Sequence, residues 1–557
     1  MADSPHSPNS GDPATPFDRA EMLRRLEHDT FDLLVIGGGI TGAGIALDAA
    51  TRGLRTALVE QYDFAHGTSS KSSKLVHGGL RYLQQGEVNL VYQALHERRR
   101  LRSNAPHLVK VLPFMIPVLT KDGVVSRKIA RALGSAMWMY DLTGGWRIGK
   151  FHKRLKKDAA FAHMPTIPKD KLASAYLYYD ATADDARLTL TVLRTAAAAG
   201  ATVANSCVVH EVLKDEHGQV NGALVEADGR RITVLAAVVV NAAGVWADDV
   251  RSLDEVKHPD SIRPAKGVHI TVPWEKVRND IAVVIPVPKD KRSLFVVPWG
   301  ELPDGTFQHT YVGTTDTDYQ GDIDDARCTK GDIDYVLAAL NFSITTKVTP
   351  DDITGVWAGL RPLVKAASSG RTADLSRHHK VVASPSGMIT TTGGKLTTYR
   401  AMAEDTVDAV LGRLHRKARC RTRSLPLVGA TGFREPPAGS AEAHLANRYG
   451  TLAGEVQALC DSRAQLAEPL VPGLPYLKAE AIYAVRAEMA LTLDDVLSRR
   501  TRARLLDRDA AVEAARSVAE LIAPDLGWST DDIDREVATF HRMCAAERDA
   551  TKVAEHV

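Results

Sequence analysis

The feature that most constrains the fold is a glycine-rich segment near the amino end, residues 31–60 (FDLLVIGGGITGAGIALDAATRGLRTALVE). An apolar run, 31–36, is followed directly by Gly37, Gly39 and Gly42 in the spacing G-x-G-x-x-G. We expect a buried parallel strand before the glycines and a helix of small residues after them. This order is typical of a βαβ unit that binds a dinucleotide.

Each residue of the turn has a physical role in such a site. Gly37 permits the tight turn, Gly39 leaves the backbone open to a pyrophosphate, and Gly42 lets strand and helix pack closely. The helix is expected over 41–51, and the amides at its amino end, near Ile40 and Thr41, attract phosphates. The alternative is a glycine-rich turn that binds nothing.

The acid that ends the next strand argues against a dinucleotide with a 2′-phosphate on its ribose, and the single fingerprint favours FAD. Glu60 follows a second apolar run, 56–59, at about the distance expected for the acid that binds ribose. A carboxylate there accepts hydrogen bonds from a 2′-hydroxyl and repels a 2′-phosphate. The fingerprint occurs once, whereas a flavoprotein that takes hydride from a nicotinamide normally has a second such site. We therefore expect the single site to hold FAD that is reduced by an organic substrate.

Composition excludes several classes of protein. The 557 residues, 44% apolar and 25% charged, predict two to four globular domains. A net charge of +2 argues against a nucleic-acid partner. The amino end lacks the pattern of a secretory signal, and no apolar run is long enough to span a membrane. The five cysteines are far apart in the sequence, which favours a reducing compartment and argues against a metal site. They are Cys207, Cys328, Cys420, Cys460 and Cys544.

Further motifs identify a family. They are residues 68–83 (TSSKSSKLVHGGLRYL), 238–247 (VVVNAAGVWA), 266–270 (KGVHI), 313–316 (GTTD), 359–363 (GLRPL) and 393–400 (GGKLTTYR). Their order and spacing closely resemble FAD-dependent glycerol-3-phosphate dehydrogenase, a membrane-associated member of the glycine oxidase and D-amino-acid oxidase class of flavoproteins. The resemblance covers about residues 31–400 and weakens beyond them.

This resemblance implies a reaction. The expected activity is oxidation of sn-glycerol 3-phosphate at C2 to dihydroxyacetone phosphate, with hydride passing to the flavin and electrons to a membrane quinone. An oxidase of the same substrate that reduces O₂ is the first alternative, and a flavin amine oxidase is the second. A binding protein in which FAD is only structural is the least favoured reading.

The resemblance also implies FAD contacts outside the glycine turn. The residues expected to contribute are Thr68, Ser69, Ser70, Lys74, Leu75, His77, Ala243, Gly244, Trp246, Gly394, Lys395, Leu396 and Thr397. Residues 68–77 are rich in hydroxyls and amide donors. Residues 243–246 form a turn over the adenosine side of FAD, unless they are a plain buried turn. The last group opens a helix whose amides stabilise negative charge on the reduced flavin.

Oxidation of a phosphorylated alcohol requires cations for the phosphate and a base for the hydroxyl proton. Arg81, Arg377 and Lys395 are the candidate phosphate ligands, although Arg377 also suits a solvated loop. His269 lies in an alternating, strand-like stretch and has a near-neutral pKa that suits a base. Arg361 is expected near the substrate hydroxyls, where it stabilises a developing alkoxide. A structural histidine and a surface arginine are the alternatives, and the sequence leaves the proton acceptor open.

We predict an α/β fold with a Rossmann-like FAD-binding domain, an antiparallel-sheet substrate domain and a helical C-terminal domain. The expected divisions are a disordered tail at 1–30, the FAD-binding domain at 31–113, 176–263 and 352–400, the substrate domain at 114–175 and 264–351, a linker at 401–429 and the helical domain at 430–557. Within these, Asp184 or Asp185 is expected to cap a helix over 186–199, and helical spacing recurs at 489–505 and 509–522.

Residues 127–157 combine nine Lys or Arg and one acid with the aromatic run 137–140 and Trp146. Basic residues mixed with aromatics suit an anionic membrane surface. Nucleic-acid binding and a solvated helix with a buried aromatic stripe are the alternatives. We expect a cytoplasmic protein that is held peripherally on the inner face of the membrane. The sequence leaves open whether it forms a homodimer.

Overall fold

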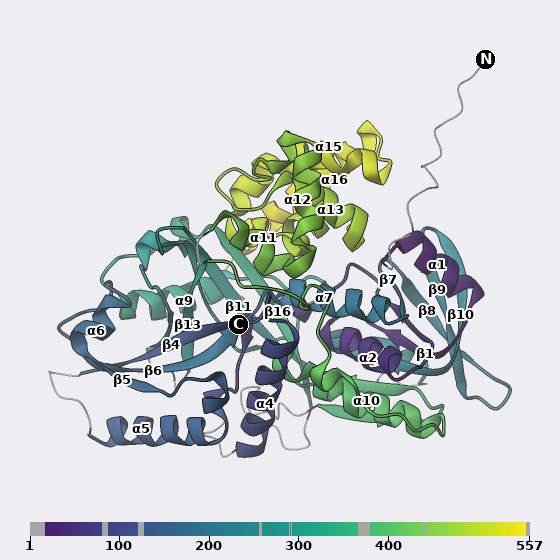
Figure 1. The fold of residues 1–557 in the computed structure, drawn as a ribbon, viewed down its shortest axis with the longest axis horizontal. Coiled ribbons are helices and arrows are strands. Elements are labelled where there is room, and N and C mark those ends of the chain that lie inside the picture. The colour runs from purple at the N-terminus through teal and green to yellow at the C-terminus, as the bar shows by residue number, and fades with distance from the viewer. Residues whose placement is uncertain are drawn as a thin grey trace.

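The computed structural model describes residues 17–80, 87–120, 127–255, 259–288, 290, 292–365, 379–437 and 440–552. Figure 1 shows two sheets side by side, with a cluster of helices from the C-terminal part of the chain above their junction. The α/β fold class and the helical C-terminal region are confirmed. Among the described residues, no helix has the length and apolar character that a membrane crossing needs.

The first sheet is the expected nucleotide-binding unit. Its strands follow the order β17-β18-β10-β1-β2-β7, with β9 added to β10 and β8 to β9. Their bounds are β1 Thr30–Ile36, β2 Thr56–Val59, β7 Thr202–Ala204, β8 Val208–Lys214, β9 Val220–Ala227, β10 Arg230–Asn241, β17 Lys380–Ala383 and β18 Ile389–Thr392. β1 pairs in parallel with β2 and β10, and α2 (Ile40–Thr51) connects β1 to β2. The predicted βαβ unit is therefore present.

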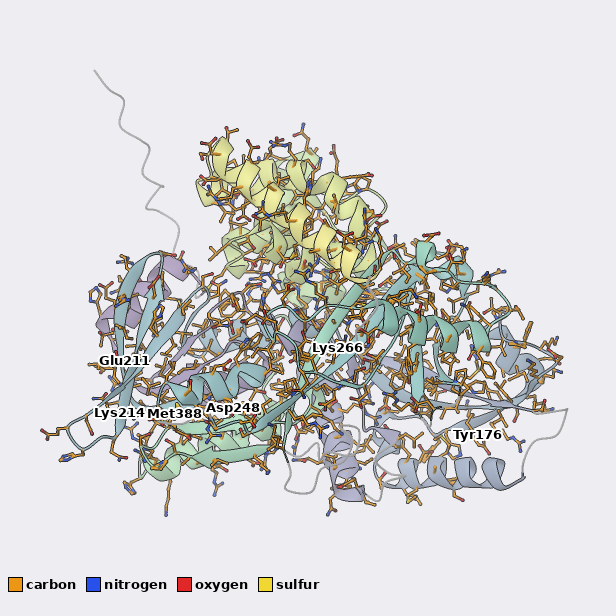
Figure 2. All side chains as sticks on the ribbon, turned by 180° about the vertical axis from the view of Figure 1, so that it is seen from behind. Tyr176, Glu211, Lys214, Asp248, Lys266 and Met388 are labelled. Atoms are coloured by element: carbon orange, nitrogen blue, oxygen red, sulfur yellow. The ribbon has the colours of Figure 1, made fainter. Side chains whose placement is uncertain are left out.

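The second sheet has ten strands in the order β15-β11-β14-β13-β12-β4-β6-β3, with β16 paired to β11 and β5 to β6. Their bounds are β3 Leu75–Val76, β4 Lys110–Leu119, β5 Lys153–Lys156, β6 Leu172–Thr182, β11 Ile262–Pro273, β12 Ala282–Pro286, β13 Ser293–Glu301, β14 Phe307–Gly313, β15 Thr317–Asp318 and β16 Gly355–Val364. All its pairs are antiparallel except β12 with β4. Helix α9 (Lys330–Ser343) packs on this sheet, where Asp332 pairs with the buried Lys266 at 2.8 Å; Figure 2 labels Lys266 on β11.

The expected domain limits need correction at several strands of the second sheet. β3 and β16 were assigned wholly, and β4, β6 and β11 in part, to the FAD-binding domain, yet all five belong to the second sheet. β16 pairs with β11 from Gly355 opposite Thr271 to Val364 opposite Ile262. The limits were misplaced because a strand's partner is set by long-range pairing and not by the local pattern. The consequence is that the motifs containing His269 and Arg361 lie on neighbouring strands.

The expected tail and the expected linker each contain a helix, and the second is the helix predicted to open at residues 394–397. The Asp18 side chain caps the amino end of α1 (Arg19–His28), which buries Met22, Leu23 and Leu26. The tail therefore ends earlier than residue 30. Residues 1–16 lie outside the described residues. α10 (Tyr399–Arg413) covers much of the expected linker and packs on α2, since a Cβ on Gly44 would lie 2.7 Å from the Tyr399 ring.

The remaining helices complete the three parts. They are α4 Val88–Asn104, α5 Arg127–Leu142, α6 Lys157–Ala162, α7 Asp185–Ala198, α8 Ala247–Ser252, α11 Ala441–Tyr449, α12 Ala453–Ser462, α13 Lys478–Glu488, α14 Ala503–Leu506, α15 Arg508–Leu526 and α16 Thr530–Ala550. The predicted helix at 509–522 is present within α15. The helical pattern at 489–505 is not one helix, because a π-helix over Asp495–Arg500 ends at the extended Thr501 before α14 begins.

Candidate active site

A cavity of about 1170 Å³ lies where the β1–α2 turn meets segments from distant parts of the chain. We call it the cofactor cavity. Thirteen of the residues predicted to contact FAD line it, and these are Gly37, Gly39, Ile40, Thr41, Glu60, Thr68, Ser69, Ala243, Gly244, Trp246, Gly394, Lys395 and Leu396. The motifs at 37–41, 68–69, 243–246 and 393–396 therefore surround one space.

The glycines of this turn fit a pyrophosphate. Gly37 has a φ of +114°, and a Cβ there would lie 2.8 Å from the carbonyl oxygen of Ala242. A Cβ on Gly42 would lie 1.9 Å from the carbonyl oxygen of Gly37, so any side chain there would separate strand and helix. Gly39 faces the cavity, with the Ser69 hydroxyl 3.1 Å from the position of its missing Cβ. The amino end of α2 is thus open to a phosphate.

Glu60 is held at the cavity wall by backbone amides. Its carboxylate accepts hydrogen bonds from the N–H of Gly38 at 2.6 Å and of Tyr62 at 3.0 Å. Burial raises the pKa of Glu60 to about 7, although these two hydrogen bonds oppose the shift. A carboxylate in this place suits the ribose hydroxyls of a dinucleotide.

A second cavity of about 930 Å³ adjoins the first. We call it the reaction cavity, because three of the residues expected to bind or react with substrate line it: His269, Arg361 and Lys395. The predicted residues Leu75, His77 and Thr397 line it as well. Thr68, Ser72, Pro362 and residues 393–396 line both cavities, so a flavin ring at their junction would face the reaction cavity.

His269 is a buried, neutral imidazole. Its Nε2 lies 2.8 Å from the Ser73 hydroxyl, and its ring stacks on Trp357. Burial lowers the pKa of His269 well below its ordinary value, and the charges of Lys74 and Arg361 lower it further. Its Nδ1 is buried and has no hydrogen-bond partner in the described part of the chain. The imidazole is therefore available as a proton acceptor at neutral pH.

Arg361 reaches the reaction cavity past a glycine on the neighbouring strand. A Cβ on Gly267 would lie 2.5 Å from Nη2 of Arg361, so glycine leaves room for the guanidinium. The Nη2 group donates to the Thr314 hydroxyl and to the carbonyl of Thr315, each at 3.1 Å. Oδ1 of Asp316 lies 3.5 Å from Nη1 of Arg361. These contacts orient a charge toward the space that His269 also lines.

The turn that carries Lys395 closes the junction of the two cavities. Lys395 immediately precedes a short helical turn, Leu396–Thr398, and lines both cavities. The Thr397 hydroxyl accepts a hydrogen bond from the N–H of His77 at 3.1 Å, which joins this turn to the 68–77 segment. Burial lowers the pKa of His77 to about 4, and the charge of Lys395 contributes.

Some predicted residues lie elsewhere. Arg81 and Arg377 lie outside the described residues. Gly42, Ser70 and Lys74 line neither of the two cavities. The Lys74 ammonium instead pairs with Asp185 at 3.0 Å and lies over the Trp357 ring. Its predicted contact with FAD stays a prediction.

Several residues that shape the reaction cavity were not predicted from the sequence. Ser73, Trp357 and Gly267 were not singled out, although Ser73 lies in the hydroxyl-rich segment and Gly267 in the KGVHI motif. The density of serines was a usable signal for a polar lining. Nothing local indicates that Ser73 bonds to His269, since 196 residues separate them.

The chain is similar to known proteins along most of its length. Residues 32–400 match the family model described as FAD dependent oxidoreductase, and residues 420–533 match that of the C-terminal domain of alpha-glycerophosphate oxidase. The glycerol-3-phosphate dehydrogenase of Mycobacterium leprae is 42% identical over 549 residues, which cover 96% of this chain and 91% of the relative. The mitochondrial glycerol-3-phosphate dehydrogenase of Mesocricetus auratus is 38% identical and covers 97% of this chain and 77% of its own.

A solved structure is also similar along the whole chain. The X-ray structure of the glycerol-3-phosphate dehydrogenase from Bacillus halodurans, complexed with FAD, has a TM-score of 0.77 and 31% sequence identity. The alignment covers 97% of this chain and 100% of that one.

Proposed function

This chain belongs to the family of FAD-dependent glycerol-3-phosphate dehydrogenases, and from that premise we propose that it oxidises sn-glycerol 3-phosphate at C2 to dihydroxyacetone phosphate and passes the electrons to a membrane quinone. The observation that carries the proposal is the convergence of His269, Arg361 and Lys395 on one cavity beside the cofactor cavity. A base and two cations are what a phosphorylated alcohol requires.

The chain's own residues have distinct roles in the proposed reaction. FAD, when bound, supplies the hydride acceptor. Lys395 binds the substrate phosphate, and the sequence offers Arg81 and Arg377 as further candidate ligands. His269 accepts the C2 hydroxyl proton, because its depressed pKa keeps the imidazole neutral. Arg361 stays protonated and stabilises the negative charge that develops on the C2 oxygen.

The electron acceptor separates two forms of this function. A quinone is our proposal, and O₂ is the alternative because residues 420–533 match the C-terminal domain of an oxidase. Stopped-flow reoxidation of the reduced protein distinguishes them. Fast reoxidation by a soluble quinone with slow peroxide formation in air supports the dehydrogenase, and rapid peroxide formation supports the oxidase.

Helix α5 and the turn after it suit the proposed membrane contact. Trp138, Met139, Leu142 and Phe151 are exposed, with Leu142 77% accessible, whereas Met137 and Tyr140 on the same helix are buried. The exposed apolar side chains therefore form an outer face, which we call the α5 face. Figure 1 shows α5 along one edge of the molecule. Nearby lysines and arginines at 150–157 supply charge for anionic lipids. We propose peripheral association with the inner face of the membrane through this surface.

A further inference from the structure

We propose that Asp185, held by Arg502 of the C-terminal helical part, positions residues Ser72–Lys74 and through them the His269 imidazole. The C-terminal part thus completes the active site, although none of its described residues lines the reaction cavity. This inference rests on the proposed role of His269 as proton acceptor. It makes Asp185 and Arg502 positioning residues and not catalytic ones.

Asp185 is the carboxylate around which the segment is organised. It is fully buried at the first residue of α7. Its Oδ2 accepts from both the N–H and the hydroxyl of Ser72, at 2.9 and 2.7 Å, and its Oδ1 lies 3.0 Å from the Lys74 ammonium. Asp184 performs the expected capping of α7, since it accepts from the N–H of Arg187. The interactions of Asp185 therefore serve the 72–74 segment.

That segment contacts His269 by two routes. Ser73 places its hydroxyl 2.8 Å from Nε2 of His269. The carbonyl of Ser72 accepts a hydrogen bond from Nε1 of Trp357 at 3.1 Å, and Trp357 stacks on the imidazole. A shift of the segment would move both neighbours of the ring at once.

Arg502 connects this arrangement to the C-terminal part. It is fully buried, and its Nη2 donates to Oδ1 of Asp185 and Oδ1 of Asp184, each at 2.6 Å. Its Nη1 donates to the carbonyl of Ser498 at 3.0 Å, which fixes the guanidinium to its own segment. Asp185, Arg502 and Lys74 are buried, whereas Asp184 is partly exposed and also lies 3.7 Å from Nη1 of Arg448. Loss of one partner leaves a buried charge uncompensated.

Pairwise substitution tests the proposal. Asp185→Asn, Ser73→Ala and the double variant are prepared with FAD bound, and flavin reduction by glycerol 3-phosphate is followed anaerobically. We expect each single variant to slow reduction roughly tenfold or more, with KM for glycerol 3-phosphate changed by less than about threefold. The double variant should be no slower than the slower single, because both changes act on one chain of contacts. The pH profiles of the two single variants should coincide.

Asp184→Asn is the matched control. It removes the other carboxylate paired with Arg502, retains a capping side chain, and leaves residues 72–74 untouched. It should lower the melting temperature about as much as Asp185→Asn while keeping the wild-type rate and pH profile. Equal slowing by both substitutions would make the effect a general loss of packing and would overturn the proposal. Independent, multiplying effects of Asp185→Asn and Ser73→Ala would overturn it too.

Arg502→Lys keeps the positive charge and tests the same chain if Asp185→Asn does not fold. Slowed reduction that is not additive with Ser73→Ala supports the proposal, and a wild-type rate contradicts it. Failure of the underlying function has a different signature. In that case, the wild-type protein itself would not be reduced by glycerol 3-phosphate.

Discussion

The imidazole of His269 stacks on the indole of Trp357, with ring centroids 4.8 Å apart and an interplanar angle of 9°. The two residues face each other on neighbouring strands, β11 and β16. This contact removes water from one face of the ring and contributes to the burial that lowers the pKa of His269. The strand pairing therefore helps to hold the pKa of the proposed base below its ordinary value.

Replacement of His269 tests that base. His269→Asn retains a polar side chain of similar reach but does not accept a proton at neutral pH. We expect flavin reduction to slow by roughly 10² or more. In the wild-type protein the neutral form is the active one, and its pKa is depressed. The reduction rate should therefore not fall as the pH drops through about 6.5, the ordinary histidine value. A tenfold or smaller effect of the substitution, or a loss of rate centred near that pH, would point to another proton acceptor.

Replacement of Arg361 separates catalysis from cofactor binding. Arg361 lines the reaction cavity but not the cofactor cavity. Arg361→Ala should abolish flavin reduction while FAD stays bound, because the alkoxide loses its stabilising charge. Arg361→Lys keeps a charge but loses the planar contact with Thr314, and should recover only part of the rate. Normal reduction by the alanine variant would remove Arg361 from the proposed site.

Gly39 is expected to be essential for FAD binding. Gly39→Val places a branched side chain in the cofactor cavity, where even a Cβ lies 3.1 Å from the Ser69 hydroxyl. The variant should be purified as colourless apoprotein with a near-normal fold. Gly412→Ala is the control, since no atom lies within 4 Å of a Cβ at that helical position. A yellow, FAD-saturated Gly39→Val protein would contradict the placement of the pyrophosphate.

Glu60 should make FAD binding depend on pH. The ionised carboxylate is the better acceptor for a ribose hydroxyl, so binding favours loss of a proton from a group whose pKa is about 7 in the absence of FAD. The affinity of apoprotein should therefore rise with pH, by about tenfold between pH 6 and 8, and level off above. Fluorescence quenching of FAD measures this. Glu60→Gln should bind with no such dependence, and an unchanged pH profile in that variant would exclude Glu60 as the source.

The α5 face should control binding to lipid. Trp138→Asp and Leu142→Asp each place a charge where an apolar side chain is exposed. Burial of either native side chain in a membrane contributes about 1.5–3 kcal/mol, so each change should weaken binding to anionic vesicles by about tenfold or more. Phe342→Asp is the control, because Phe342 is similarly exposed, at 55%, on α9. Equal losses for all three variants, or none, would contradict the assignment of this surface.

The sequence predicts the parts of this protein whose structure depends on local spacing. Gly37, Gly39 and Glu60 lie within one βαβ unit, so their order along the chain determines their arrangement. The capping of α7 by Asp184 is local in the same way. His269 and Arg361 were identified through motifs. Their placement on one cavity depends on the pairing of β11 with β16, which the motifs do not specify.

The parts that the sequence could not predict depend on distant contacts. β16 was assigned to the FAD-binding domain, although it pairs with β11 in the second sheet, because an apolar strand pattern does not specify its partner. α1 was expected to lack structure because its residues suit a solvated segment until their apolar sides pack on the first sheet. The helix opened by residues 394–397 was predicted, but the linker was expected to begin at 401, which lies inside α10. Asp185 was interpreted as a helix cap, and its bonds to Ser72 and Arg502 span 113 and 317 residues.

Anaerobic titration of the FAD-loaded protein with glycerol 3-phosphate tests the central proposal most directly. We predict that the oxidised flavin absorbance disappears and that dihydroxyacetone phosphate forms in an amount equal to the reduced flavin. Glycerol without a phosphate, or an amino acid, should leave the protein yellow. A flavin that stays oxidised with glycerol 3-phosphate, or that is reduced by amino acids instead, would contradict the account.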